Sequence, residues 1–379
     1  MCGALILSPL VNACSLRPSN PPPASVTPAP AAVPPTAVAQ AELSATATIS
    51  GSNEGAADTA AGPAAQPMAQ PTAQPTSTAA LSQIALVRDD NRAQGVARAL
   101  ALLNPDPLRA KNVLLKPNFN SADPSPGSTH PDILRALLSH LEEMGAGPIT
   151  LADRSGMGDT RRVMEQIGLF DLLDDYDFQT VVLDELAEED WVLFRRPGLH
   201  WQDGFPIPRL LTDAAAVVQT CNLKTHRYGG HFTMSLKNSV GFVAKTMRPG
   251  GHNYMTELHN SPYQRLMIAE INAAYAPALI VMDGVEAFVS GGPANGKRVS
   301  PSVILAGRDR VAIDAAGVAI LRMFGTTPEV SRGRIFEQEQ IARAVELGLG
   351  AAGPEQIEFI TADAQSAEFA DQMREHLLA

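Results

Sequence analysis

The sequence predicts an α/β fold in which a mainly parallel sheet, or sheets, is flanked by helices. Two observations predict this fold. From Gln83 onward, short apolar runs alternate with amphipathic stretches, which is typical of repeated β-α units. Several of these runs are rich in Val, Ile and Leu without alternation, as expected of strands covered on both faces. Residues 83–379 are numerous enough to form one large domain or two close lobes.

The apolar runs predict the strands of this sheet. In chain order they are Ile84–Val87, Asn112–Lys116, Ile149–Ala152, Thr180–Leu183, Ala215–Thr220, Ala278–Met282, Ser302–Ala306 and Ile357–Thr361. The clearest predicted helix covers Pro131–Met144, because proline suits the first helical position and the apolar residues that follow share one face. Amphipathic stretches predict further helices at Asn91–Leu103, Thr160–Ile167, Pro262–Ala274, Arg310–Phe324, Phe336–Leu347 and Ala364–Leu378.

Residues 1–14, MCGALILSPLVNAC, resemble the apolar part of an export signal. The segment is too short to span a membrane, and Ala13 stands directly before Cys14 as at a lipoprotein cleavage site. No Lys or Arg precedes the apolar run, and Asn12 is unusual at its place, so plain disorder is the alternative. We expect export, lipidation of Cys14, and a lipid-anchored location on the outer face of the cytoplasmic membrane.

Residues 15–82 have the composition of a linker. They are rich in Pro, Ala, Thr, Ser and Gln and carry almost no charge. Such a segment cannot bury enough apolar surface to offset the entropy lost on ordering, so we expect a disordered tether. A diacylated cysteine followed by a long tether would hold the folded region off a membrane surface.

Composition excludes several classes of function. The formal net charge is -11 with a pI near 5.2, and aromatic residues make up 5% of the chain, so neither a basic nucleic-acid face nor a base-stacking platform is expected. Of the three cysteines, only Cys221 lies in the folded region, which excludes an internal disulfide and an iron–sulfur cluster there. Cys221 ends an apolar run and is expected to be a small buried hydrophobe, with a catalytic thiol as the alternative.

Polar side chains follow four of the predicted strands. Because ligands of open α/β sheets bind beyond the carboxyl ends of the strands, these side chains predict one site, with ordinary polar loops as the alternative. They are Lys116 and Asn118, Asp153 and Arg154, Lys224 and His226, and Asp283.

The loop Gly127–His130 leads directly into the clearest helix. Its hydroxyl groups and the free N–H groups of the helix start suit a phosphate or carboxylate. The alternative is that Thr129 or His130 only caps the helix.

Cationic and imidazole groups concentrate between Lys224 and His259, a segment that contains four of the chain's eight histidines. Such a concentration in an acidic protein indicates a small anionic ligand, with histidines as acid/base groups or metal ligands. The histidine spacing matches no standard metal motif, so a bound divalent metal is kept only as the alternative, and the cofactor is unknown. The segment includes Lys224, His226, His231, Lys237, Asn238, Lys245, Arg248, His252 and His259.

The sequence resembles the domain-of-unknown-function family 362 over nearly all of residues 83–361. The resemblance lies in LLKPNF (114–119), STHPDILRALL (128–138), ITLADRSG (149–156), LKTH (223–226), FTMSLKNSVG (232–241), VMDGVEAFVSGGPANG (281–296) and AGRDRVAIDAAG (306–317). The resemblance adds Asp309 and Asp314 to the candidate site residues, although Asp314 is equally suited to capping or pairing near its helix. Many members carry a ferredoxin-like cluster module; this chain lacks those cysteines, so a redox role does not follow.

A weaker resemblance links the chain to the nickel-dependent lactate racemase family. Gly229-Gly230, Lys237 and Arg248-Pro249-Gly250, followed by His252 or His259, are similar to the segment in which that family's lysine carries a nickel cofactor and its histidines move a proton. The spacing differs here, so the resemblance implies shared architecture and does not imply nickel.

Two functional hypotheses follow. The first is an enzyme acting on a small carboxylate or phosphate ester, in which His226, Lys237, Asp153 and His259 are catalytic. In both hypotheses the ligand is held by Lys116, Asn118, Thr129, His130, Arg154, Lys224, Asn238 and Asp283. The second hypothesis is a membrane-tethered anion- or solute-binding protein, in which the same cations bind without chemistry.

Overall fold

The computed structural model describes residues 81–105 and 108–379. The predicted export signal, Cys14 and all but the last two residues of the predicted linker lie outside these residues. Within the described part of the chain, no helix is both long and apolar enough to cross a membrane.

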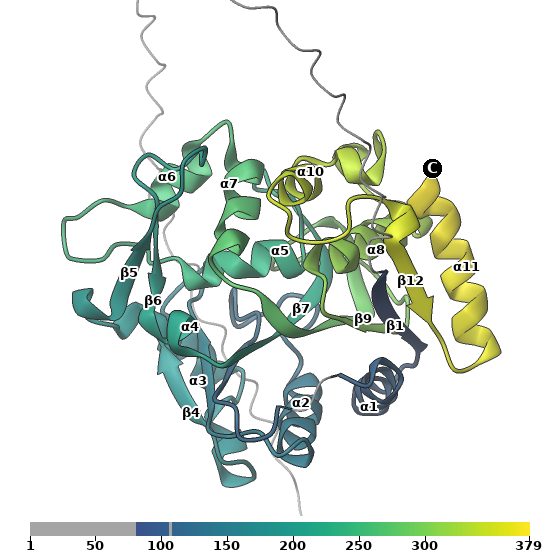
Figure 1. Ribbon diagram of the computed structural model, residues 1–379, viewed down its shortest axis with the longest axis horizontal. Coiled ribbons are helices and arrows are strands. Elements are labelled where there is room, and N and C mark those ends of the chain that lie inside the picture. Colours follow the sequence, from purple (N-terminus) through teal and green to yellow (C-terminus); the bar gives the residue numbers. More distant parts are fainter. Residues whose placement is uncertain (1–80, 106–107) are drawn as a thin grey trace, which may run out of the picture. The chain divides into compact units, whose positions relative to one another are not determined.

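The main feature is a ten-stranded sheet with helices on both faces (Figure 1). Its path is β12-β1-β11-β9-β7-β2-β3-β4, with β10 paired to β9 and β8 paired to β7. Pairing is parallel from β9 through β7, β2 and β3 to β4 and between β1 and β12, and antiparallel around β11. The strands are β1 Ser82–Arg88, β2 Val113–Lys116, β3 Ile149–Asp153, β4 Gln179–Val182, β7 Ala216–His226, β8 His231–Thr233, β9 Pro277–Gly291, β10 Gly296–Val299, β11 Val303–Gly307 and β12 Ile357–Ile360. The predicted α/β fold with a mainly parallel sheet is therefore confirmed.

Two strands are much longer than predicted. β7 continues to His226 and β9 to Gly291, whereas apolar composition alone ended them at Thr220 and Met282. The extension of β7 is paired with β8, so that Lys224 faces Thr233 in the register. The expectation that Lys224, His226 and Asp283 lie on loops after strands is therefore wrong, because cross-strand hydrogen bonds extend the strands into polar sequence.

All seven predicted helices are present, and short ones were missed. The predicted helices correspond to α1 Arg92–Leu103, α2 Pro131–Glu143, α3 Thr160–Gln166, α7 Gln264–Ile271, α8 Arg310–Met323, α10 Glu339–Glu346 and α11 Ala364–Leu378. The missed ones are α4 Arg209–Asp213, α5 Ser235–Asn238, α6 Tyr254–Asn260 and α9 Pro328–Ser331. None of these four is long enough to show a helical period of apolar residues.

The sheet separates two cores. Alternate residues of β1 face opposite sides, with Ile84 and Leu86 in one core and Ala85 and Val87 in the other. Helices α1, α2 and α3 cover the second side, and α8, α10 and α11 cover the first (Figure 1).

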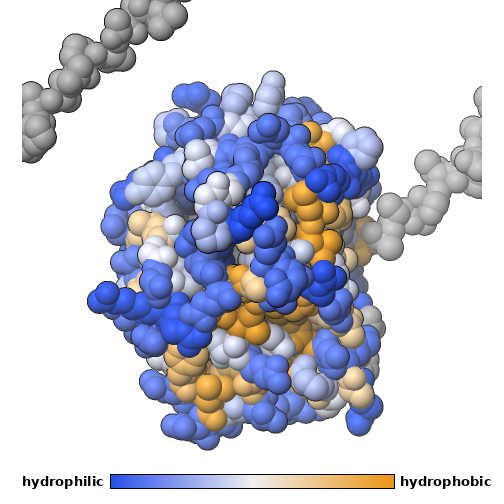
Figure 2. All heavy atoms as spheres, turned by 90° about the vertical axis from the view of Figure 1, so that its left-hand side faces the viewer, coloured by the Kyte–Doolittle hydropathy of each residue, from blue (hydrophilic) through white to orange (hydrophobic). Residues whose placement is uncertain are grey.

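A third core lies under a two-stranded sheet, β5 Trp191–Phe194 and β6 Phe205–Pro208. It joins this hairpin to α6 and α7. Figure 2 shows the molecule from this side, where apolar residues are visible in patches between hydrophilic ones. The hairpin, α6 and α7 thus form an extra layer at the side of the sheet, and α6 lines the cavity described next.

Candidate functional site

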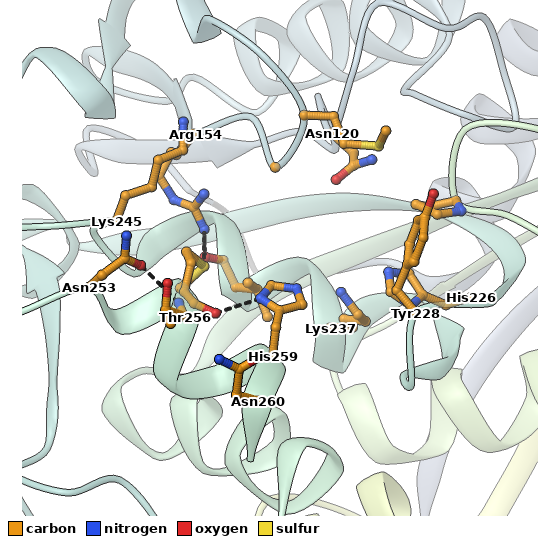
Figure 3. Close-up of a pocket in the computed structure, with 15 residues that line it drawn as sticks. Asn120, Arg154, His226, Tyr228, Lys237, Lys245, Asn253, Thr256, His259 and Asn260 are labelled. Carbon is orange, nitrogen blue, oxygen red and sulfur yellow. Dashed lines mark hydrogen bonds between the residues drawn. The ribbon is translucent and has the colours of Figure 1, made fainter. Parts of the chain in front are cut away.

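A cavity of about 560 Å³ opens between the residues after β2 and β3, the end of β7, and α6. A chamber of about 40 Å³ shares part of its wall with this cavity. The cavity is lined by Asn120, Arg154, Gly156, Met157, His226, Tyr228, Lys237, Val240, Lys245, Asn253, Met255, Thr256, His259, Asn260 and Pro293 (Figure 3). The chamber adds Lys116, Asn118, Asp153, Lys224, Thr233, Asn238 and Gly241.

A buried ion pair forms part of the chamber wall. Lys116 ends β2 and Asp153 ends β3, and Lys116 Nζ lies 2.7 Å from Asp153 Oδ1 with both side chains at most 2% exposed. Lys116 also donates to Asn238 Oδ1 at 3.1 Å, and Asp153 accepts from the Phe119 backbone N–H at 2.7 Å. Burial lowers the pKa of Lys116 while Asp153 opposes that shift. Lys116 and Asp153 therefore largely satisfy each other.

Arg154 is buried in the wall, and its guanidinium donates to three backbone carbonyls and to Met255 Sδ at 3.1 Å. Its guanidinium donates to the carbonyl oxygens of Val240 and Val243, each at 2.7 Å, and to that of Ser155 at 3.1 Å. These bonds fix the segment that follows α5. The guanidinium charge also repels the ammonium form of Lys237 and so contributes to the lowered pKa of that residue.

Lys224 faces the chamber without an ion pair to any described residue. Its Nζ donates to Asn118 Oδ1 at 2.9 Å and to the Gly127 carbonyl. Asn118 is itself held in place, since its backbone N–H donates to Thr129 Oγ1 at 2.8 Å. Burial, helped by repulsion from Lys237, lowers the pKa of Lys224 to about 7.

Lys237 is placed by the short helix α5. The N-terminus of α5 is held by Asp314 of α8, which accepts from the backbone N–H groups of Ser235 at 2.7 Å and Leu236 at 3.1 Å. Asp314 is fully buried, and this burial raises the pKa of its carboxyl to about 7. Asp314 therefore caps α5, which agrees with the capping alternative given for this residue in the sequence analysis.

The Lys237 ammonium has no hydrogen-bond or ion-pair partner among the described residues. Burial, then repulsion from Arg154, lowers its pKa to about 8. Gly230 makes room for it, because a Cβ at that position would lie 2.9 Å from both Lys237 Cε and His226 Nδ1. Lys237 and His226 thus lie against the same side of Gly230.

Two imidazoles flank Lys237 in the cavity (Figure 3). His226 is buried, and its Nδ1 has no hydrogen-bond partner. Burial, then repulsion from Lys237 and Lys224, lowers the pKa of His226 well below 6.5. His259 donates from Nδ1 to the Met255 carbonyl at 2.7 Å, which leaves Nε2 as the basic nitrogen. The pKa of His259 is also lowered, first by burial.

Several predicted residues lie outside the cavity. Asp283 pairs with Arg92, Oδ2 to Nε at 2.8 Å, and does not line either space. Thr129 only supports Asn118, and His130 accepts from the Asp132 N–H at the start of α2, which matches the capping alternative. His252 pairs with Glu257 at 2.6 Å.

Asp309 caps α8, and His231 and Arg248 do not line the cavity. Within residues 81–105 and 108–379, no group of three or more His, Cys, Asp and Glu side chains is arranged to hold a metal ion. Cys221 is buried in the core, and burial raises its pKa well above the ordinary value, as expected of an inert thiol.

Asn120 was missed by the sequence reasoning. It lines both the cavity and the chamber, and its Nδ2 is buried without a hydrogen-bond partner. Asn120 stands two residues after Asn118 in the segment that follows β2. This position was the only feature of the sequence that could have indicated it as a site residue. An unpaired buried donor at this point suits an acceptor atom of a ligand.

Comparisons with known proteins identify a family and two individual similar proteins. A family model described as "Domain of unknown function (DUF362)" matches residues 113–319. A curated relative, "Thylakoid-associated protein sll1697" from Synechocystis sp., is 28% identical over 219 residues, which are 56% of this chain and 63% of the relative. The alignment thus spans less than two thirds of that protein.

Among solved structures, the lactate racemase apoprotein from Thermoanaerobacterium thermosaccharolyticum aligns with a TM-score of 0.37 at 18% identity. The alignment covers 78% of this chain and 86% of that chain.

Proposed function

This chain belongs to the family described as "Domain of unknown function (DUF362)", and from the chemistry of its cavity we propose that it is an enzyme that binds a small anionic substrate and transfers protons on it. The substrate class is a small carboxylate or phosphate ester. Its anionic group would enter the chamber, and the rest of the molecule would occupy the cavity.

One observation carries the proposal: Lys224 and Lys237 both face the chamber, and neither has a carboxylate partner among the described residues. A buried charge without a counter-ion costs free energy, and this penalty lowers the pKa values of both lysines. A bound anion would offset this free-energy penalty by supplying the missing counter-ion. The unpaired Asn120 Nδ2 would supply a neutral donor to the same ligand.

The imidazoles support catalysis rather than binding alone. With lowered pKa values, His226 and His259 are neutral near pH 7 and can accept a proton. His259 has its proton on Nδ1, so Nε2 is the nitrogen that would take one from a substrate. Asp153 would act indirectly, by holding Lys116 and the backbone of Phe119.

The test is hydrogen exchange with solvent. The full chain would be incubated in D₂O with a panel of small carboxylates and phosphate esters, and deuterium incorporation at carbon followed by NMR. We expect incorporation into at least one compound, lost in His259→Gln. If compounds raise the melting temperature but none exchanges, the protein is an anion-binding protein without catalysis.

We also propose that the protein is exported and lipid-anchored through Cys14. The support is the apolar segment ending at Cys14 and the uncharged Pro-rich residues after it. Cys14→Ser should move the protein from the membrane fraction to the soluble fraction, with Cys2→Ser as the matched control. Unchanged membrane association of Cys14→Ser would contradict the proposal.

A further inference from the structure

The three lysines of the chamber differ in what their amino groups contact. Lys116 has a carboxylate partner, and Lys224 has two oxygen acceptors. Lys237 has neither within the described chain. Lys237 also lines both the cavity and the chamber, whereas Lys116 and Lys224 line only the chamber. Of the three amino groups, that of Lys237 is therefore the one without a partner at the larger space.

The surroundings of Lys237 are those of a nucleophile. Its amine faces a cavity large enough for a small substrate, and His226 and His259 lie close enough to exert electrostatic effects with it. The guanidinium of Arg154 is a further cation nearby. An amine desolvated beside other cations is the arrangement in which lysine attacks carbonyl carbon.

We propose that Lys237 forms a covalent imine with the carbonyl group of a small carboxylate, an aldehyde acid or a 2-oxo acid, whose carboxylate is held by Lys224. This inference rests on the proposed function and narrows its substrate class. The chamber volume of about 40 Å³ has room for roughly three water molecules. That space suits a planar carboxylate better than a tetrahedral phosphate, which has more heavy atoms.

The step balances without an oxidant or reductant. The neutral Nζ of Lys237 adds to the carbonyl carbon, and the carbonyl π pair becomes the O–H bond of a carbinolamine. His259 Nε2 takes a proton from the attacking nitrogen and returns it to the hydroxyl, which leaves as water. The product is a protonated imine, R₂C=N⁺H–Lys237, and one proton from solvent completes the balance.

The test is reductive trapping. The full chain would be incubated near pH 8 with glyoxylate or pyruvate and cyanoborohydride, followed by intact-mass measurement and peptide mapping across the chain's six lysines. With a pKa of about 8 against an ordinary 10.5, Lys237 has a free-amine fraction roughly a hundredfold larger than a surface lysine at this pH. Lys224 also has a lowered pKa, but it does not line the larger cavity, and its Nζ donates to Asn118 Oδ1 and to the Gly127 carbonyl. We expect a single adduct, on Lys237.

The control variants are Lys237→Arg, which keeps the charge and removes the nucleophile, and Lys297→Arg, an exposed lysine on β10. The adduct should disappear in the first and persist in the second. Adducts spread over the exposed lysines, or an adduct on Lys224, would overturn the inference.

Binding of carbonyl-free anions separates this inference from the proposed function. Melting shifts would be measured on the same samples with lactate and inorganic phosphate. A shift with these anions but no adduct overturns only the covalent step. No shift and no adduct overturns both.

Discussion

Two clusters of buried charge in this molecule are built differently. In the Glu270 cluster, made of His200, Glu270 and Arg343, the buried carboxylate accepts from His200 Nδ1 at 2.6 Å and from Arg343 Nε at 3.0 Å. In the chamber cluster, made of Lys116, Asp153, Lys224 and Lys237, three lysines line the same chamber, and of these only Lys116 pairs with Asp153.

The difference supports the proposal that the chamber cluster binds a ligand, while the Glu270 cluster has a structural role. The Glu270 cluster joins the loop before Trp201 to α7 and α10, and its charges are paired within the chain. The chamber cluster is left with excess positive charge beside a cavity. A folded protein can tolerate such an excess when a bound anion completes it.

The largest expected effect comes from breaking the one pair in the chamber cluster. Asp153→Ala would leave the Lys116 ammonium buried without a counter-ion, so the free energy of unfolding should fall by about 3–5 kcal/mol. Urea denaturation measures it. Asp203→Ala, which removes an exposed partner of Arg195, is the control and should leave the midpoint unchanged. Equal midpoints for both variants would contradict the buried-pair interpretation.

The fold was predicted well because its strands and helices carry strong apolar patterns. The site was predicted less well for physical reasons. Lys224 and His226 lie inside β7, where pairing with β8 outweighs polar composition. Lys237 depends on α5, a helix stabilised by Asp314 from a distant segment. Asp283 was grouped with the site because it follows an apolar run, whereas its partner Arg92 lies outside the cavity.

A smaller effect of opposite sign is expected at Lys237. Lys237→Met removes an ammonium that has no partner among the described residues, so the free energy of unfolding at pH 7 should rise by about 1–2 kcal/mol. Arg343→Met in the Glu270 cluster should instead lower it, because the buried Glu270 loses two hydrogen bonds. If both substitutions lower the free energy of unfolding equally, the ammonium of Lys237 is not an unpaired charge that destabilises the fold.

The smallest effect is on the pH dependence of stability. The folded-state pKa values of Lys224 and Lys237 are about 7 and about 8, below the ordinary 10.5. At pH values between these folded-state values and 10.5, the unfolded chain binds more protons than the folded chain, so the free energy of unfolding should rise with pH. Melting temperatures between about pH 8 and pH 9.5 should therefore increase, and the slope should be shallower in Lys237→Met. A slope unaffected by the substitution would show that other groups cause it.

We propose that a bound anion completes the chamber cluster, and a ligand titration measures this binding. Pyruvate and inorganic phosphate would be titrated into the full chain by calorimetry, with Lys224→Met as the test variant and Lys297→Met as the control. We predict binding of at least one anion, weakened by about tenfold or more in Lys224→Met, which corresponds to about 1.4 kcal/mol, and unchanged in Lys297→Met. Equal affinity in Lys224→Met and the unaltered chain, or no binding of either anion, would contradict the account.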